Sequence, residues 1–575
     1  MIKLFRYLKP FAIPIAVVLA LVAAQSLTEL YLPTLMSDIV DTGISKGDTD
    51  YILSTGGIML LYAAGGMACA ILSSFLSARV AMGYGRNLRR RIFAHVEGFS
   101  LHEFDRIGTP SLITRSTNDV TQVQMFTMMM LRMLVQAPIM AVGGVVMALS
   151  KDRTLTWVLV VVIPILAVVI SITATKALPL FRSMQAKIDR INLVLRENLT
   201  GIRVIRAFNR IDYETERFHA ANEDLTATAI KVNRIMAVLM PVMMIVMNFT
   251  TIAIVWFGAI RIDGGHMQVG SLMAFIQYAM QILFSLLLVS MLFVFLPRAS
   301  ASAVRINEVF ALSPSIRDPE NPRKPGALRG DVEFRAVGFR YHGAEEPVLH
   351  DISFHAKPGE VTAIIGGTGS GKSTLINLIP RFYDVERGSV LVDGVDVREM
   401  SQEDLRSRIG FVPQKAVLFT GTVGDNIRYG NPEATDEQVA RAAQTAQAKE
   451  FILGMKDGFD APIAQGGTNV SGGQKQRLAI ARALVRKPEI YVFDDTFSAL
   501  DFKTDANLRA ALRKETKEAT VIIVAQRVNT VMDADRILVL DEGRVAGMGS
   551  HRELMKTCAV YREIVSSQLS EEELA

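Results

Sequence analysis

Hydrophobic residues follow different patterns in the two halves of the chain. Up to about residue 300 they form long, nearly continuous runs, and beyond that point short apolar runs alternate with polar segments. Six of the long runs reach the length of about 20 mostly apolar residues that a bilayer-spanning helix needs. They lie at about 11–35, 52–78, 126–150, 154–180, 235–260 and 271–297. The pattern predicts a six-helix, all-α transmembrane domain ahead of a globular domain.

The connections between these spans differ in length and charge. Short loops follow spans one, three and five, while nearly 50 polar, helix-like residues follow span two and more than 50 follow span four. Arg and Lys crowd the two long connections, whereas the short loop at 36–51 has one lysine against four aspartates. Basic connections favour the cytoplasm. We therefore expect a multi-pass protein of the cell membrane with a cytoplasmic N-terminus and a cytoplasmic C-terminal half.

Overall composition excludes little. Hydrophobic residues make up 50%, mean hydropathy is +0.28 and the formal net charge is +5. The basic clusters flank membrane spans and lack interleaved aromatics, so no nucleic-acid partner is expected. Cys69 and Cys558 are far apart, which predicts neither a disulfide framework nor a metal site between them.

Several polar side chains interrupt the predicted spans, and polar residues inside a membrane are costly and often functional. Hydrogen bonds between helices, or reach toward the interface from span ends, explain such residues equally well. The spans are also rich in methionine, which suits varied apolar ligands but also simply fills helix packing. The polar residues are Gln25, Glu29, Arg132, Asn248, Gln277 and Gln281.

A proline-rich stretch separates the two halves. Residues 313–330 contain four prolines, and strand-like and helix-like runs alternate after them, as in an α/β domain. We therefore expect a transmembrane domain at 1–312, a linker at 313–330 and an α/β domain at 331–575.

The sequence GGTGSGKST fits the P-loop pattern G-x-x-x-x-G-K-[ST], between an apolar strand at 361–365 and a helix-like run at 375–379. Its glycines let backbone N–H groups close around phosphate, and the helix N-terminus favours the negative charge. Lys372 is predicted to reach the β- and γ-phosphates, and the Ser373 hydroxyl to bind Mg²⁺. The nucleotide-binding residues expected here are Gly366, Gly367, Thr368, Gly369, Ser370, Gly371, Lys372, Ser373 and Thr374.

A second apolar strand, at 490–493, ends in two adjacent carboxylates, Asp494 and Asp495. In a P-loop protein such a strand supplies an Asp that supports Mg²⁺, and Asp494 fits that place. Asp495 then stands where a base could hold the attacking water.

Another helix N-terminus follows Val470. Ser471 is a predicted N-cap, two glycines come next, and a basic amphipathic helix continues. This is a second phosphate cradle. Since one nucleotide seldom needs two cradles from a single chain, we interpret it as serving a nucleotide held by a second chain.

With these motifs the chain resembles the ATP-binding cassette (ABC) transporters over nearly its whole length, in the layout of a half-size exporter. The most specific motif is Val470-Ser471-Gly472-Gly473-Gln474, where the family usually has Leu-Ser-Gly-Gly-Gln. The resemblance implies that Tyr341 stacks on adenine and that Gln414 links the γ-phosphate and Mg²⁺ to the membrane half. It also implies a D-loop at 498–501, ending in Asp501 and reaching across a dimer, and coupling helices near 101–116 and 200–215.

Three positions depart from the family pattern. Asp495 stands where the family has Glu, Gln526 where it has a switch His, and Gln465 where many exporters have an acid. The shorter acid withdraws the carboxylate by about 1.5 Å, and about 1 Å of misplacement can cost on the order of 10²-fold in rate. Gln cannot exchange a proton as His can. The catalytic candidates are therefore Asp495, Gln526 and Gln414, and the metal-site candidates are Ser373, Gln414 and Asp494.

The resemblance and these departures imply the degenerate-site subunit of a heterodimeric bacterial multidrug-type exporter. Such a subunit binds ATP and Mg²⁺, hydrolyses slowly at its own P-loop, completes its partner's site with its signature, and exports amphipathic drugs or lipids. A homodimeric exporter of lipid or peptide with two working sites, and an ATP-gated or regulatory membrane protein, remain alternatives. An importer is disfavoured because its membrane and nucleotide-binding parts usually lie on separate chains.

Overall fold

The computed structural model describes residues 1–326 and 329–569. The chain divides into two compact units, and the first comprises residues 1–97 and 110–312. The second comprises 98–109 and the chain from 313 onward. Residues 327–328 of the predicted linker and 570–575 of the predicted α/β domain lie outside the described residues.

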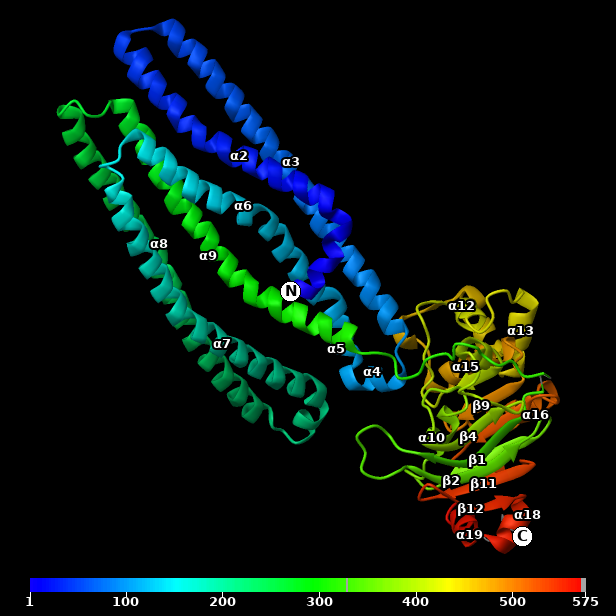
Figure 1. The fold of residues 1–575 in the computed structure, drawn as a ribbon. Coiled ribbons are helices and arrows are strands. Elements are labelled where there is room, and N and C mark those ends of the chain that lie inside the picture. The colour runs from blue at the N-terminus through cyan, green and yellow to red at the C-terminus, as the bar shows by residue number, and fades with distance from the viewer. Residues whose placement is uncertain (327–328, 570–575) are drawn as a thin grey trace. The chain divides into compact units, whose positions relative to one another are not determined.

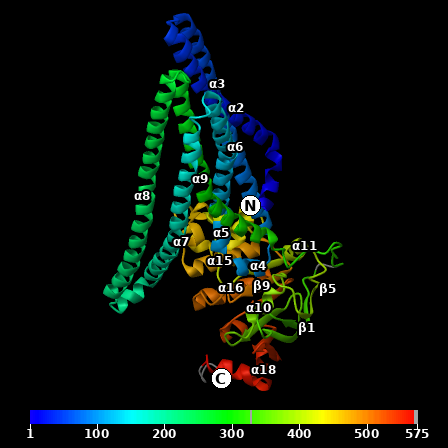
Figure 2. The same ribbon diagram turned by 60° about the vertical axis from the view of Figure 1, so that its left-hand side comes forward.

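The first unit is entirely helical where it is described, and helices α2, α3, α6 and α9 pack against one another while α7 packs mainly on α8. The long helices carry six candidate membrane spans, which confirms the six spans predicted from hydropathy. Figures 1 and 2 show α7 and α8 as a hairpin that diverges from the other helices toward its turn. The helices are α1 (Ile2–Phe5), α2 (Ala12–Asp38), α3 (Thr49–Glu97), α5 (Thr109–Thr114), α6 (Val120–Lys151), α7 (Trp157–Ala207), α8 (Ile211–Asp263) and α9 (Val269–Ala311).

The helices run well beyond the apolar stretches from which they were predicted. Helix α3 has 49 residues, α7 has 51 and α8 has 53, where the predicted spans had about half as many. At 1.5 Å per residue each is about 75 Å long, against a bilayer core of about 30 Å. The second long connection therefore continues the membrane helices α7 and α8, and the first continues α3 before it forms short separate helices ahead of α6.

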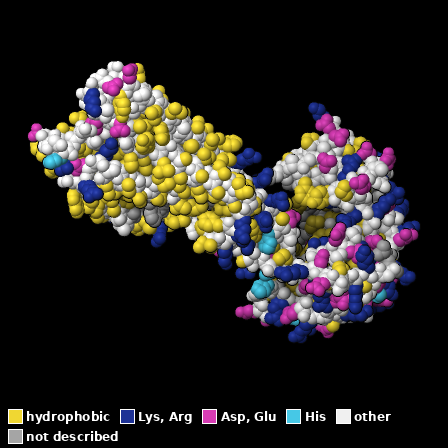
Figure 3. All heavy atoms as spheres, turned by 45° about the horizontal axis from the view of Figure 1, so that its top comes forward, with side chains coloured by type: hydrophobic (Ala, Val, Ile, Leu, Met, Phe, Trp, Pro, Cys, Tyr) yellow, Lys and Arg dark blue, Asp and Glu magenta, His cyan; other side chains and the backbone are white. Residues whose placement is uncertain are grey.

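Outward-facing side chains of the first unit are largely apolar, as Figure 3 shows over its helices. Trp157, Phe249 and Trp256 are each 68% exposed. Large exposed apolar patches are rare on soluble monomers, so this surface fits lipid or a second chain.

The predicted coupling segment at 101–116 is broken into two pieces. Helix α4 (Leu101–Ile107) ends at Gly108, whose φ of 81° is open to glycine but rarely to other residues, and α5 starts at Thr109. The other predicted coupling segment, 200–215, consists of the end of α7, a turn and the start of α8.

The second unit contains two main sheets. One has the order β2-β1-β4-β5, and the other has the order β12-β11-β3-β10-β9-β6. In the second sheet all neighbours are parallel except β11 and β12. The strands are β1 (Val332–Phe339), β2 (Leu349–Ala356), β3 (Val361–Gly366), β4 (Arg387–Val392), β5 (Val395–Asp396), β6 (Ile409–Val412), β7 (Gly421–Thr422), β8 (Pro462–Ile463), β9 (Ile490–Asp494), β10 (Thr520–Val524), β11 (Arg536–Asp541) and β12 (Arg544–Gly549).

Side chains of alternate residues in the six-stranded sheet point to opposite faces and pack into two different hydrophobic cores. Val492 and Ile522 face the core shared with the four-stranded sheet, while Phe493 and Ile523 face the core under α15 and α16. Because both faces are covered, β9 and β10 are buried at every position, which explains their uninterrupted apolar sequences. The helices are α10 (Lys372–Asn377), α11 (Gln402–Ser407), α12 (Val423–Arg428), α13 (Asp436–Thr445), α14 (Lys449–Leu453), α15 (Gly472–Val485), α16 (Phe502–Glu515), α17 (Val528–Val531), α18 (His551–Thr557) and α19 (Ala559–Ser566).

Candidate nucleotide site

Four parallel neighbours in the six-stranded sheet bring the predicted site residues to one edge. The P-loop follows β3, Asp494 ends β9, Gln526 lies two residues beyond β10, and Gln414 lies two residues beyond β6. Since the carboxyl ends of parallel strands meet at the same edge, residues far apart in the sequence converge there.

The P-loop is an open cradle. Gly369 and Gly371 have φ of 84° and 92°, which only glycine adopts readily. A Cβ at Gly366 would approach the Leu540 carbonyl oxygen at 2.1 Å, whereas a Cβ at Gly367 or Gly369 would meet nothing within 4 Å. The end of β3 at Gly366 is therefore closely packed. The loop that follows has free space on its exposed side, which a bound phosphate chain requires.

Lys372 turns back over this loop. Its Nζ donates to the carbonyl oxygens of Gly366 at 2.9 Å and Gly367 at 2.6 Å. Burial lowers the pKa of Lys372, against the attraction of Asp495 and Asp494, which acts in the opposite direction. A buried ammonium held by neutral carbonyls is a group that an anionic phosphate would stabilise.

The two residues predicted to support Mg²⁺ are directly joined. Ser373 donates from its hydroxyl to Asp494 Oδ1 at 3.0 Å. Burial raises the pKa of Asp494, and the adjacent Asp495 raises it further, while the Ser373 hydrogen bond and Lys372 lower it. A hydroxyl and a carboxylate in contact are hard oxygen ligands of the type that Mg²⁺ prefers. The residues present therefore fit the ion.

The Asp495 carboxylate accepts hydrogen bonds from both glutamines that the sequence predicts as catalytic residues. Gln526 Nε2 donates to Asp495 Oδ2 at 2.8 Å, and Gln414 Nε2 donates to the same oxygen at 3.1 Å. Gln414, predicted to serve the metal as well, thus contacts Asp495 and not Asp494. The backbone of Asp495 has φ of 43°, a left-handed conformation that Asp tolerates better than most residues.

The segment that carries Gln526 is fixed by a residue that sequence reasoning missed. Gln568, beyond α19, donates from Nε2 to the Gln526 carbonyl oxygen at 2.8 Å and accepts from the Val528 N–H at 2.9 Å. No sequence motif marks this contact, because Gln568 binds only the backbone atoms of Val528 and Gln526, which lie 40 and 42 residues away in the sequence.

Tyr341 lies at the other side of the P-loop helix. Its hydroxyl is 3.0 Å from Thr374 Oγ1, and its ring meets the rings of Phe339 and Tyr383 edge to face at 4.9 and 5.4 Å between centroids. Tyr383 also reaches Asp105 of α4, with its hydroxyl 3.4 Å from Oδ2. Burial, together with Asp105, raises the pKa of Tyr383 to about 12. Tyr383 and Asp105 were not predicted from the sequence.

The signature residues form a separate surface. Ser471 caps α15, because the Gln474 N–H donates to Ser471 Oγ at 3.3 Å and the Ser471 N–H donates to Gln474 Oε1 at 2.9 Å. A Cβ at Gly473 would come within 3.1 Å of the Ala499 carbonyl oxygen, so the signature packs against the D-loop. Among the described residues, no hydrogen bond joins Val470–Gln474 to the P-loop of the same chain.

The D-loop continues this exposed surface. Asp501 caps α16 by accepting from the Thr504 N–H at 2.9 Å, and that hydrogen bond lowers the pKa of Asp501. Ser498, Ala499 and Asp501 are exposed, and Phe502 is 72% exposed.

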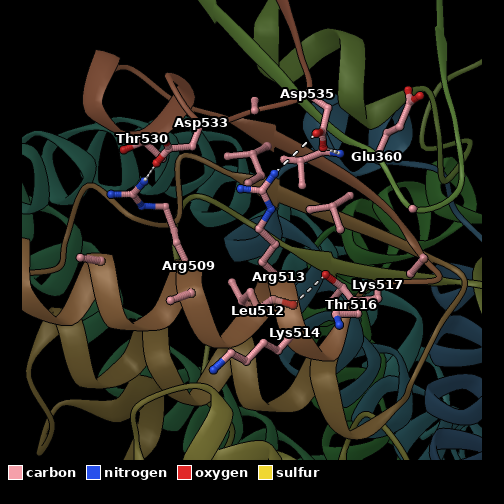
Figure 4. Close-up of a pocket in the computed structure, with 18 residues that line it drawn as sticks. Glu360, Arg509, Leu512, Arg513, Lys514, Thr516, Lys517, Thr530, Asp533 and Asp535 are labelled. Carbon is pink, nitrogen blue, oxygen red and sulfur yellow. Dashed lines mark hydrogen bonds and ion pairs between the residues drawn. The ribbon is translucent and has the colours of Figure 1, made fainter. Parts of the chain in front are cut away.

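A hollow of about 650 Å³ lies at the opposite, amino-terminal ends of β3 and β10 (Figure 4). Arg509 and Arg513 reach across it from α16 to Asp533 and Asp535, at 3.5 Å each. Asp535 also accepts from the Val361 N–H at 2.9 Å. These contacts tie α16 to the sheet, and none of the predicted site residues lines the hollow.

A P-loop cradle, a hydroxyl–carboxylate pair beside it and six membrane spans together define a membrane protein with a nucleotide-binding domain. Residues 15–286 match the family described as ABC transporter transmembrane region, and residues 349–498 match the family described as ABC transporter. The chain belongs to the ABC transporter family.

Individual relatives cover nearly the whole chain. An uncharacterized ABC transporter ATP-binding protein of Mycobacterium tuberculosis is 46% identical over 98% of this chain and 97% of its own length. An ATP-dependent lipid A-core flippase of Aromatoleum aromaticum is 35% identical over 87% of this chain and 83% of its own. The solved structure of a bacterial Atm1-family ABC exporter with ATP bound is 26% identical, with a TM-score of 0.81 over 97% and 98% of the two chains.

These likenesses establish the layout of a half-size ABC exporter. The protein crosses the membrane six times, its nucleotide-binding domain is cytoplasmic, and that domain is an ATPase of the ABC type.

Proposed function

We propose that this chain is the degenerate-site subunit of a heterodimeric ABC exporter that moves lipid-type amphipathic molecules. It binds ATP at its own P-loop and hydrolyses it slowly. Its signature completes the partner's P-loop site, where most hydrolysis takes place.

The environment of Asp495 carries this proposal. Its Oδ2 accepts hydrogen bonds from two amides, of Gln526 and Gln414, at 2.8 and 3.1 Å. An amide neither takes nor gives a proton at neutral pH, so neither of these two partners can exchange a proton with the carboxylate as an imidazole would. Because Asp is one methylene shorter than Glu, its free oxygen lies about 1.5 Å short of the position that a Glu carboxylate would have beside the attacking water. A misplacement of about 1 Å can already lower the reaction rate on the order of 10²-fold.

Nucleotide binding does not depend on that carboxylate. Lys372 and the open P-loop would bind the phosphates, and Ser373 and Asp494 would bind Mg²⁺. The Tyr341 ring would stack on the base. Mg²⁺ supplies charge neutralisation at the phosphates when bound. A site with these groups and a weak base would hold ATP for long periods, and in a dimer it would hold the two ATP-binding domains together.

The separation of the signature from the P-loop supports a second chain. Helix α15 packs on α12, α13 and β6, whereas α10 packs on β3 and β9. Ser471 and Gly472 are exposed, and a Cβ at Gly472 would meet nothing within 4 Å. The D-loop beside them is also exposed, and a second chain that covers the signature would cover this loop as well.

The transported class rests on the relatives and on the spans. The flippase of Aromatoleum aromaticum acts on lipid A-core by its name, and it shares 35% of its aligned residues with this chain. Exposed methionines in the spans, such as Met240 and Met244, provide adaptable apolar contacts for varied acyl or aromatic groups.

One observation favours a homodimer with two working sites as the second candidate. Among the described residues, Asp495 Oδ1 makes no hydrogen bond, so one carboxylate oxygen remains open to accept a proton from water.

Lys372→Ala is expected to weaken nucleotide binding at this chain at least about tenfold, because hydrogen bonds to charged groups contribute about 1.5–3 kcal/mol. Photolabelling of the heterodimer with 8-azido-ATP, followed by separation of the two subunits, measures it. Lys514→Ala, an exposed lysine on α16, is the control and should label normally. Unchanged labelling of the Lys372 variant would remove the assignment of this P-loop.

Tyr341→Ala is expected to weaken binding by about 1–3 kcal/mol through the loss of base stacking. Tyr341→Phe keeps the ring and loses only the contact to Thr374, so it should bind nearly as the wild type does. The same photolabelling titration, together with a thermal melt, distinguishes a Tyr341 that stacks on the base from one that only packs in the core. If Tyr341 is only a core aromatic, Tyr341→Ala lowers the melting temperature and leaves the affinity of the folded fraction unchanged.

A further inference from the structure

Hydrogen bonds link three of the polar residues in the spans, two on α2 and one on α9. Gln25 Nε2 donates to Glu29 Oε1 at 2.8 Å, and Gln281 Nε2 donates to the Glu29 carbonyl oxygen at 3.1 Å. The same two helices are joined again by the hydroxyls of Thr34 and Tyr278, 2.6 Å apart. Gln25, Glu29 and Gln281 are called the α2–α9 polar cluster below.

The cluster lies deep within the spans. The cytoplasmic domain follows span six, so the N-terminus is on the same side and Asp38 is at the outer end of α2. Glu29 is about 14 Å along the helix from Asp38, and Gln281 is about 18 Å from Val269, the outer end of α9. The short Gln and Glu side chains cannot reach the interface from there, so snorkelling does not explain them.

Hydrogen bonding in the cluster is unbalanced toward acceptors. Each of the two amide nitrogens donates one hydrogen bond, at 2.8 and 3.1 Å, and keeps one further N–H. Among the described residues, Gln25 Oε1, Glu29 Oε2 and Gln281 Oε1 accept no hydrogen bond. Gln281 Oε1 is in addition buried, and a buried polar atom without a partner is costly where no water can reach it.

Nearby hydroxyls do not share this imbalance. Ser26 donates to the Val22 carbonyl oxygen at 2.8 Å, and Ser285 donates to the Ile282 carbonyl oxygen at 2.7 Å, each within its own helix. Arg132, the basic side chain in the third span, is on α6 and makes no hydrogen bond or ion pair with the cluster in the described part of the chain. In the part of the chain that the structure describes, no hydrogen bond reaches these oxygens and no cationic side chain pairs with the Glu29 carboxylate.

We propose that the α2–α9 polar cluster binds the ammonium head of a transported amphipath. An ammonium has three donors and no acceptor, and its charge complements the Glu29 carboxylate. Glu29 is partly exposed, so a ligand can reach its side chain. Met280, which precedes Gln281 on α9 and is 39% exposed, offers an adaptable apolar surface for the rest of the molecule.

This inference rests on the proposed export function and adds the head-group chemistry of the substrate. A lipid amine and a soluble amphipathic amine share that chemistry. They differ in whether the membrane itself supplies the ligand.

The test compares two fluorescent probes on the heterodimer in phosphatidylcholine nanodiscs, with empty nanodiscs subtracted. The amine probe is 11-(dansylamino)undecylamine and the acid probe is 11-(dansylamino)undecanoic acid, which share the reporter and the chain length. Saturable binding of the amine at least tenfold tighter than that of the acid is expected. Nanodiscs with added phosphatidylethanolamine displace the amine if the natural ligand is a lipid, and leave it bound if the ligand is a soluble amphipath.

Variants assign the binding to the cluster. Glu29→Gln keeps the size of the side chain and removes its charge, so it should weaken the amine at least tenfold and leave the acid unchanged. Gln281→Leu should weaken the amine severalfold. Asn248→Leu, a polar residue of the fifth span outside the cluster, should change neither probe.

Equal affinity of the wild type for both probes overturns the proposal, and this comparison needs no variant to fold. Unchanged amine binding by Glu29→Gln also overturns it. A heterodimer that hydrolyses ATP with its partner but does not prefer the amine refutes the ammonium site alone. A chain that needs no partner for hydrolysis refutes the proposed function alone.

Discussion

Ser471→Arg is expected to remove most ATP turnover of the assembled heterodimer, by about a hundredfold, although Ser471 makes no contact with this chain's own P-loop. The reason is steric and electrostatic. Ser471 begins α15 at an exposed surface, and a bulky side chain there would block closure over the partner's γ-phosphate. The substitution acts on the partner's site, where we expect most hydrolysis to take place.

Asp495→Asn, in contrast, is expected to leave total turnover nearly unchanged. Its carboxylate oxygen already accepts two amides, and the site contributes little of the hydrolysis. The two variants are compared by steady-state phosphate release from the same heterodimer. If Asp495→Asn alone eliminated hydrolysis, the short carboxylate would be a working base and the homodimer candidate would take first place.

Ser550→Arg is the matched control for Ser471→Arg. Ser550 caps α18 with the same reciprocal bonds, since the Ser550 N–H donates to Glu553 Oε2 at 2.8 Å and the Glu553 N–H to Ser550 Oγ at 3.4 Å. Loss of either cap costs about 1 kcal/mol of stability. Only the Ser471 variant should lose turnover, and an equal loss in both would reduce the effect to destabilisation.

The double change Asp495→Glu with Gln526→His is expected to raise turnover at this chain's own site by about ten- to a hundredfold. Glu returns the carboxylate by about 1.5 Å, within the range where about 1 Å is worth on the order of 10²-fold. An imidazole in place of the Gln526 amide adds a group that can exchange a proton. Asp495→Glu alone should give a smaller gain.

This gain is measured in a heterodimer whose partner has its own base neutralised and carries an unaltered Ser-Gly-Gly signature. Phosphate release then reports this chain's P-loop. Adding Lys372→Ala to the double variant should return turnover to background. A double variant with no gain would show that the missing methylene and the missing imidazole are not what limits the site.

Hydropathy alone located all six spans, because a run of about 20 apolar residues has few other uses. It did not give the extent of the helices. The cytoplasmic parts of α3, α7 and α8 are polar and carry no apolar signal, although they continue the same helices. The break at Gly108 was missed for the opposite reason, since a single glycine with positive φ interrupts a segment that otherwise has helical character.

The candidate site was predictable where a motif lies in one stretch of sequence. The P-loop, Asp494 and the signature were each recognised from a few adjacent residues, and their roles in binding remain predictions. The contacts of Gln414 and Gln526 on one oxygen of Asp495 were not foreseen, because they depend on the order of β6, β9 and β10 in the sheet. Gln568 and Tyr383 were missed altogether, since neither belongs to a local pattern.

The α2–α9 polar cluster shows the same limit inside the membrane. The sequence marked Gln25, Glu29 and Gln281 singly, and either function or helix packing explained each one. Only the pairing of α2 with α9 reveals that the three residues are linked and that, among the described residues, the Glu29 carboxylate has no cationic partner.

Whether this chain hydrolyses ATP by itself is decided by measuring the ATPase activity of the purified chain with and without its partner subunit. We expect the chain alone to bind 8-azido-ATP but to release phosphate near background, and we expect the partner to restore a turnover that depends on the partner's base. Full turnover by the chain alone, lost on Asp495→Asn, would contradict the degenerate-site account.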